Sequence, residues 1–142
     1  MTTYESDIKT ISSGEEVVFG LISDLNNLQI LQKDERVQEK LKDLTFDADS
    51  CSFTVDMLGN IGFRIIEREP FKTVKMEVFN VPMQINFWIQ LKQVAENDTK
   101  MKLTLKADFP TMIKMMVDSK LKEGINTIAG YLADGLNKKL NG

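Results

Sequence analysis

The hydrophobic positions of the chain follow two periods, and the change between them predicts an α+β fold. Residues 2–11 alternate weakly between apolar and polar positions, which predicts an exposed or edge strand. Residues 13–16 have the spacing of a capping box, and apolar residues follow at helical intervals. A second helical start comes at Asp24. We therefore expect two short helices after the first strand.

The middle of the chain has a period of two. Segment 32–43 is mostly charged, and we expect it to form a surface connection with one or two helical turns. Beyond it, turn-forming residues and prolines separate runs of alternating apolar and polar positions. These runs cover residues 52–57, 61–65, 74–79, 85–92 and 101–107. Five or six consecutive strands of this kind predict an antiparallel meander with one apolar face.

The last part of the chain returns to a helical period, from Pro110 to about Leu140. Its apolar residues repeat every three or four positions: Ile113, Val117, Leu121, Ile125, Ile128, Leu132 and Leu136. A helix of about 28 residues is about 42 Å long, enough to cross the sheet. Gly124, Gly130 and Gly135 interrupt this helix, which indicates a close approach to the sheet or a bend. We expect one domain, residues 1–142, in which a curved antiparallel sheet wraps around the helix.

Charge and composition narrow the function classes. The net charge of −3 argues against a nucleic-acid partner, because phosphate binding needs a basic surface. The chain has no histidine and a single cysteine, Cys51, so a Ser/His/Asp triad and an internal disulfide are excluded and a zinc site is not expected. We expect no metal and no cofactor. No signal-peptide pattern and no run of roughly 18 apolar residues occurs, so we expect a cytoplasmic protein without a membrane span.

Three stretches resemble a known family. VVFGLISDLNNLQ (17–29) is similar to its first helix pair, DSCSFTVDMLGNIGFRIIEREPFKTV (49–74) to its central hairpin, and LKADFPTMIKMMVDSKL (105–121) to its last strand and long helix. This family is the START/birch-pollen-allergen superfamily, also called SRPBCC, which includes the polyketide cyclase/dehydrase and lipid transport group. The resemblance implies a helix-grip fold with an apolar cavity between sheet and helix. It also implies binding of lipids, sterols, polyketides or plant hormones, or cyclase activity, with no shared catalytic residues to assign here.

The candidate ligand-binding residues are apolar strand positions on the helix side of the sheet and the methionines at the helix start. Methionine is flexible and polarisable, which suits a pliable cavity wall. Ordinary core packing is the alternative for each of these positions. The set is Phe53, Val55, Met57, Phe63, Ile65, Met76, Ile85, Phe87, Ile89, Leu103, Leu105, Met112, Met115 and Met116.

Three functions remain open. The first is binding or transport of a small hydrophobic molecule by a monomer or homodimer. The second is a cyclase or dehydratase, which would need an inward titratable group; Tyr4, Tyr131 and Arg64 would have to point inward, against the expected alternation. The third is a protein-interaction module with a filled core, acting through segment 32–43 or through Trp88, which falls on the outward phase of its strand.

Overall fold

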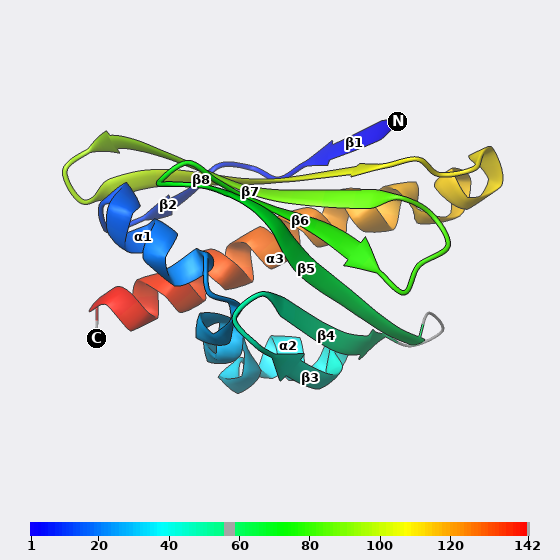
Figure 1. The fold of residues 1–142 in the computed structure, drawn as a ribbon, viewed down its shortest axis with the longest axis horizontal. Coiled ribbons are helices and arrows are strands. Elements are labelled where there is room, and N and C mark those ends of the chain that lie inside the picture. The colour runs from blue at the N-terminus through cyan, green and yellow to red at the C-terminus, as the bar shows by residue number, and fades with distance from the viewer. Residues whose placement is uncertain (56–58, 142) are drawn as a thin grey trace.

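The computed structural model describes residues 1–55 and 59–141, and for Lys40 and Val55 it describes the backbone (Figure 1). The N-terminal part contains β1 (Thr2–Glu5), β2 (Lys9–Ile11), α1 (Glu15–Ile22), the 3-10 helix η1 (Leu25–Lys33) and α2 (Glu35–Lys40). The remainder contains β3 (Lys42–Phe46), β4 (Ser50–Val55), β5 (Gly59–Glu69), β6 (Thr73–Phe79), β7 (Ile85–Ala95), β8 (Asp98–Ala107) and α3 (Thr111–Asn141).

The strands form a single antiparallel sheet in the order β1-β8-β7-β6-β5-β4-β3. The meander from β4 to β8 is therefore as the alternation predicts. β3 is not among the predicted runs, because it begins inside segment 32–43, where a surface connection was expected; the helical turn expected in that segment is α2. The expected strand at residues 2–11 is instead two strands, and both pair with β8. The break follows Ser6, whose backbone N–H and side-chain oxygen both bond to the backbone of Leu103 at 2.9 Å. This serine fixes the end of β1 against β8 before the chain turns into β2.

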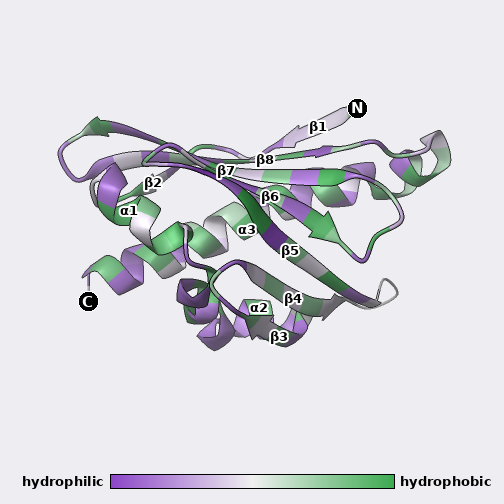
Figure 2. Cartoon of the chain, in the orientation of Figure 1, coloured by the Kyte–Doolittle hydropathy of each residue, from purple (hydrophilic) through white to green (hydrophobic). Residues whose placement is uncertain are grey.

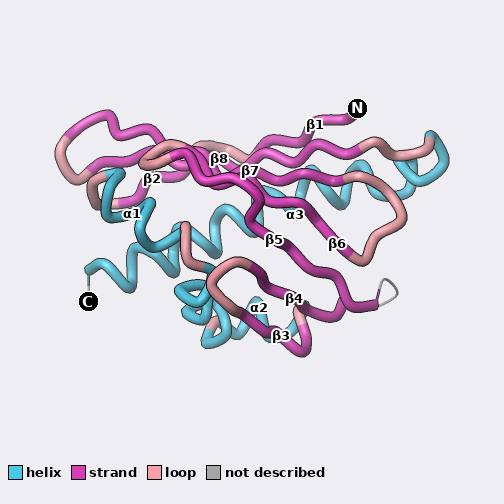
Figure 3. The backbone as a smooth tube through the Cα atoms, viewed as in Figure 1, coloured by secondary structure: helices cyan, strands magenta, loops and turns pink. Residues whose placement is uncertain are grey.

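The sheet curls around α3. Figure 1 shows it running from β1 and β8 at the top to β3 and β4 at the bottom, with α3 passing between, and Figure 3 shows the same grip in the backbone alone. α3 has 31 residues, close to the predicted length. Figure 2 shows the alternation of apolar and polar residues along the strands that gives the sheet its apolar inner face. The expected helix-grip fold is confirmed.

The main core lies between the sheet and the second half of α3. Ile125, Leu132 and Leu136 of α3 are buried there with Ala129 and Ala133. Strand and N-terminal helix residues complete it: Ile11, Val18, Ile22, Leu25, Val74, Ile89, Met101 and Leu103. Burying one such Val, Leu or Ile side chain contributes about 1.5–3 kcal/mol, so this end of the molecule carries much of the stability.

Two details of α3 differ from the expected stripe. Ile128 is 45% exposed, because it does not lie on the side of the helix that faces the sheet. That side carries the buried residues Ile125, Ala129 and Leu132. Gly135 does have a packing reason, although the partner is η1 rather than the sheet: a Cβ there would lie 3.0 Å from Cδ1 of Ile30. At Gly124 a Cβ would meet nothing within 4 Å.

The short helices are capped differently from the prediction. The capping box at residues 13–16 does not form, because the N-cap of α1 is Gly14 and it has no side-chain cap. Gln93 of β7 replaces it: its Oε1 accepts a bond from the Glu15 N–H at 2.9 Å, and its N–H donates to the Glu15 carboxylate at 3.2 Å. Asp24 and Asp34 cap η1 and α2 through their own carboxylates. In the described part of the chain, no helix is long and apolar enough to cross a membrane.

Candidate functional site

A chain of aromatic rings crosses the inner face of the sheet. Phe53 of β4 and Phe63 of β5 stack with ring centroids 5.9 Å apart, and Phe63 meets Phe87 of β7 edge-on at 5.5 Å. The strand register produces this arrangement, because Phe63 lies opposite Val78 and Phe87 lies opposite both Met76 and Leu105. These residues form the apolar surface that faces the first half of α3.

The predicted ligand-binding residues fall into groups of different accessibility. Ile65, Met76, Phe87, Ile89 and Leu103 are buried, and Phe53, Phe63, Ile85 and Leu105 are half-buried. Met112, Met115 and Met116 are 72–79% exposed, so they do not form an enclosed wall. Val55 lies in β4, and Met57 lies outside the described residues.

The apolar side chains between sheet and helix are buried at one end and only half-buried at the other. Ile89 and Leu103 are buried at the end covered by α1, η1 and the second half of α3. Toward the start of α3, the side chains facing each other from sheet and helix are only half-buried: Phe63, Ile85, Ile113, Val117 and Leu121. Half-buried apolar side chains facing one another leave apolar area for a further molecule to cover.

One flank of α3 is fastened to the edge of the sheet. α3 packs most closely against β1, β2, β8 and η1. Side chains of α3 form hydrogen bonds with the β1–β2 edge at three levels along the helix. Asp118 accepts from the Tyr4 hydroxyl at 2.8 Å, and Asn126 accepts from the Asp7 N–H at 2.6 Å. Asn137 accepts from the Ser12 N–H at 2.8 Å and donates to the Thr10 carbonyl at 3.0 Å. These bonds also satisfy backbone groups at the edge of the sheet.

The opposite flank of α3 is joined to the N-terminal helices rather than to the sheet. Arg36 of α2 bonds to Asp34 at 2.6 Å and to Asp134 of α3 at 3.2 Å, and its guanidinium lies 4.3 Å from the ring centroid of Tyr131. The hydrogen bond from Arg36 lowers the pKa of Asp34 to about 2. Among the described side chains of β4, β5 and β6, none bonds to α3. In the described part of the chain, the hydrogen bonds between α3 and the sheet therefore come from the β1–β2 edge.

Tyr4 points inward, contrary to the expectation from alternation. Its side chain is 2% exposed, and its hydroxyl donates to Asp118, which also pairs with Lys122 at 3.1 Å. Burial and then the bond to Asp118 raise the pKa of Tyr4 to about 12, and the same bond lowers the pKa of Asp118. Tyr4 is thus a neutral donor already committed to one acceptor, which does not suit a general base at neutral pH.

The other polar groups considered from the sequence lie elsewhere. Arg64 is on the outer face, bonded to Glu77 at 3.1 Å and stacked over Phe79. Cys51 packs half-buried against the core, and burial raises its thiol pKa to about 11, which is unlike a reactive cysteine. In residues 1–55 and 59–141, no group of three or more Cys, Asp or Glu side chains is placed to hold a metal ion.

Two hollows lie on the surface away from the inner face. One of about 490 Å³ lies between η1 and the end of α3 and includes Ile30, Leu31 and Lys138 in its lining. The other, of about 280 Å³, lies on the outer face of the sheet beside Trp88. Sequence reasoning placed Trp88 on the outward phase and did not identify the polar residues around it, because their grouping depends on the register between β5, β6 and β7.

Comparison with known proteins gives matches in structure and not in sequence. No protein-family model and no curated protein matches the chain. Truncated norcoclaurine synthase from Thalictrum flavum is similar with a TM-score of 0.74 and 11% identity, over 98% of this chain and 92% of that chain. A protein from Thermobifida fusca is similar with a TM-score of 0.66 and 11% identity, over 97% of this chain and 95% of that chain. A START superfamily protein from Mycobacterium smegmatis is similar with a TM-score of 0.58 and 10% identity, over 98% of this chain and 97% of that chain.

These likenesses extend over nearly the whole chain at low identity, and so they concern the fold. Each covers the N-terminal strands, the meander and the gripping helix together. The chain therefore has the START-like helix-grip fold, shared with a START superfamily protein and with norcoclaurine synthase.

Proposed function

We propose that the protein binds a small apolar molecule in the open end of its interior, between β4–β7 and the first half of α3. The observation that carries this proposal is the change along α3 from buried to half-buried apolar side chains. Ile125 and Leu132 are buried, while Ile113, Val117 and Leu121 face the sheet half-buried. The START superfamily protein with the same fold supports the choice of a binding role.

Apolar burial supplies the driving force in this proposal. Removing apolar surface from water contributes about 25 cal/mol per Å², before the cost of association. A ligand lying against Phe53, Phe63 and Ile85 covers the area that α3 leaves accessible. The inner face offers few polar groups to orient such a molecule, since the Tyr4 hydroxyl is taken by Asp118. Shape and apolar area, rather than hydrogen bonds, then select the ligand.

The exposed methionines are proposed as an adaptable rim of this opening. Met112, Met115 and Met116 lie in the first turns of α3, next to the half-buried Ile113 and Val117. Unbranched methionine side chains change conformation easily, so they can fold over a ligand that enters between helix and sheet.

A matched set of lysine variants tests the proposal. Val117 is half-buried on the inner side of α3, and its neighbour Met116 is exposed. We expect Val117→Lys to weaken uptake of an apolar fluorescent dye strongly and Met116→Lys to weaken it partly. Ile66→Lys, at an exposed position of β5, is the control and should leave uptake unchanged.

The measurements are dye fluorescence and native mass spectrometry of the protein as purified. Competition by a fatty acid, a sterol and an aromatic polyketide would then sort the ligand class. Two outcomes would contradict the proposal: a purified protein that carries no ligand and takes up no dye, or dye uptake that falls equally in all three lysine variants.

An enzyme of the cyclase or dehydratase class is the second candidate function. The inward position of Tyr4 favours it, with Tyr4 as a neutral proton donor rather than as a general base. Tyr4 lies opposite Leu105, which in turn lies opposite Phe87 on the aromatic surface. Norcoclaurine synthase shows that the same fold occurs in a synthase. Turnover of a bound aromatic substrate that is lost in Tyr4→Phe, with binding retained, would favour this candidate over simple binding.

A further inference from the structure

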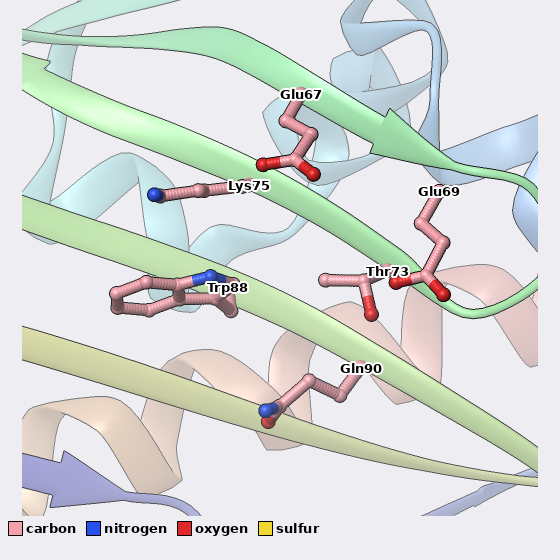
Figure 4. A pocket seen from close by; sticks show the side chains of 6 residues that line it. All are labelled: Glu67, Glu69, Thr73, Lys75, Trp88 and Gln90. Atoms are coloured by element: carbon pink, nitrogen blue, oxygen red, sulfur yellow. The ribbon is translucent and has the colours of Figure 1, made fainter.

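The outer face of the sheet, on the side away from α3, has a polar hollow of about 280 Å³ (Figure 4). It spans β5, β6 and β7, and the register explains its shape. Glu69 lies opposite Thr73, which lies opposite Gln90; one row along, Glu67 lies opposite Lys75, which lies opposite Trp88. Thr73 is the small residue among long ones. The hollow therefore sits above Thr73, with the longer side chains as its walls.

Several polar groups around the hollow have no partner within the described chain. With the described residues, the carboxylates of Glu67 and Glu69 form no ion pair or hydrogen bond, and neither does the Thr73 hydroxyl. Gln90 accepts a bond from Thr104 through its Oε1 at 2.7 Å, which leaves both amide N–H groups available. The walls thus present free acceptors from β5 and free donors from β7, facing each other across Thr73.

Trp88 forms one end of the hollow and is held in position. The Lys75 ammonium lies 5.4 Å from its ring centroid and the Lys106 ammonium 5.6 Å, one from each neighbouring strand. Figure 4 shows the indole nitrogen on the ring edge that faces Thr73 and Lys75. The indole N–H adds a donor beside an apolar ring surface, a combination that suits ligands with both polar and apolar parts.

The lining disfavours three ligand classes. An anion would meet the carboxylates of Glu67 and Glu69, and a cation would meet Lys75 and Lys106 at the tryptophan. A wholly apolar molecule would leave the carboxylates without water or a partner. A neutral ligand that presents both donors and acceptors around a compact ring has none of these conflicts.

We infer that this hollow is a binding site for one ring of a neutral sugar. The hydroxyls of a sugar ring can donate to Glu67 and Glu69 and accept from Gln90 and Lys75, and its C–H groups can lie against the Trp88 indole. The volume is close to the lower end of small-molecule pockets, roughly 300 Å³, which fits a single ring. The site lies on the opposite face from the proposed apolar one and does not depend on it.

Trp88 makes the inference directly testable, because it is the only tryptophan of the chain. Its fluorescence is recorded while the protein is titrated with D-glucose, D-galactose, N-acetylglucosamine and their disaccharides. We expect a saturable change with at least one of them, with a dissociation constant of about 1–10 mM, as befits a shallow site. Thr73→Phe fills the hollow and keeps a strand-forming residue, and should weaken binding about tenfold or more.

The control is Lys102→Ala on β8, outside the hollow and opposite Gln90 on the same outer face, which should bind sugar as the parent does. Amide NMR shifts confined to β5, β6 and β7 would locate the site. Three outcomes each overturn the inference. The first is no saturable response to these sugars up to about 50 mM, and the second is sugar binding by Thr73→Phe that equals that of the parent. The third is a saturable response to spermidine and not to sugar, with the spermidine response lost in Glu67→Gln. Apolar dye uptake should be unchanged in Thr73→Phe. The sugar-site proposal and the apolar-ligand proposal are therefore tested independently of each other.

Discussion

The hydroxyl of Tyr4 in β1 donates to a carboxylate oxygen of Asp118 in α3 at 2.8 Å, across 114 positions of sequence. Tyr4 is buried at the edge of the sheet, and Asp118 lies in the half of α3 whose apolar residues are least buried. This bond therefore holds the start of α3 to one side of the sheet, while no described side chain of β4, β5 or β6 forms a hydrogen bond or ion pair with α3.

Removing the Tyr4 hydroxyl should loosen the first half of α3. We expect Tyr4→Phe to lower the free energy of unfolding by about 1 kcal/mol, because a hydrogen bond is lost while the ring stays buried. Urea unfolding followed by circular dichroism measures the change. Amide hydrogen exchange should increase around residues 111–121 and stay unchanged around 130–140. Uniform exchange along α3 would contradict the idea that this bond fixes the helix start.

Asp118→Asn is the matched variant at the other end of the bond. The asparagine carbonyl can still accept from Tyr4, so we expect a smaller loss of stability than in Tyr4→Phe. The double variant should lose less than the sum of the two single changes, because both act on the same interaction. Additive losses would show that the two side chains contribute independently.

The titration of Tyr4 gives a prediction at alkaline pH. The pKa of Tyr4 is raised from about 10 to about 12 by burial and by Asp118, so folding favours the protonated phenol. The resulting stabilisation is fully present below about pH 10 and is lost as the pH rises toward about 12. The stability difference between the parent and Tyr4→Phe should shrink over that window. The ultraviolet absorbance of tyrosinate, compared between the two proteins, should place the Tyr4 ionisation near pH 12.

Regular alternation was enough to predict strands β4 to β8 from sequence, and apolar residues at every third or fourth position were enough to predict the long helix. Val74, Met76 and Phe87 lie on the inner face as their period indicates, and Trp88 lies on the outer face. The first strand was harder to predict, because the alternation there is weak. Tyr4 and Ser6 do share one face, yet Ile8 of the same phase is 64% exposed, since the chain turns between β1 and β2.

The candidate site was predicted in part, for a physical reason. Alternation says which strand residues share a face, but not how far the sheet extends over α3. Met112, Met115 and Met116 cover much of the helix circumference together with Ile113 and Val117, so their pattern has no preferred side. Only the three-dimensional position of the helix start shows that the methionines are exposed and the other two face inward.

Two glycines of α3 should respond oppositely to alanine. At Gly124 a Cβ meets nothing within 4 Å, so Gly124→Ala should raise stability by about 1 kcal/mol through helix propensity. At Gly135 a Cβ would lie 3.0 Å from Cδ1 of Ile30, so Gly135→Ala should gain less or destabilise. Thermal unfolding compares the two. Shortening the neighbour with Ile30→Val should make Gly135→Ala more favourable, and its failure to do so would exclude the contact as the cause.

The turn between β5 and β6 contains a strained phenylalanine whose two effects can be separated. Phe71 has a φ of 68°, a conformation that is unfavourable for a residue with a bulky side chain, and its ring meets Phe19 of α1 edge-on at 6.0 Å. The ring contact ties this turn to α1, at the closed end of the interior. Phe71→Ala removes the contact and keeps the strain, whereas Phe71→Gly removes both. We expect Phe71→Gly to be more stable than Phe71→Ala by about 1 kcal/mol, because glycine adopts positive φ freely. Urea unfolding of the two variants and of Phe19→Ala measures these effects, and a Phe71→Gly variant less stable than Phe71→Ala would show that the backbone of this turn is not strained.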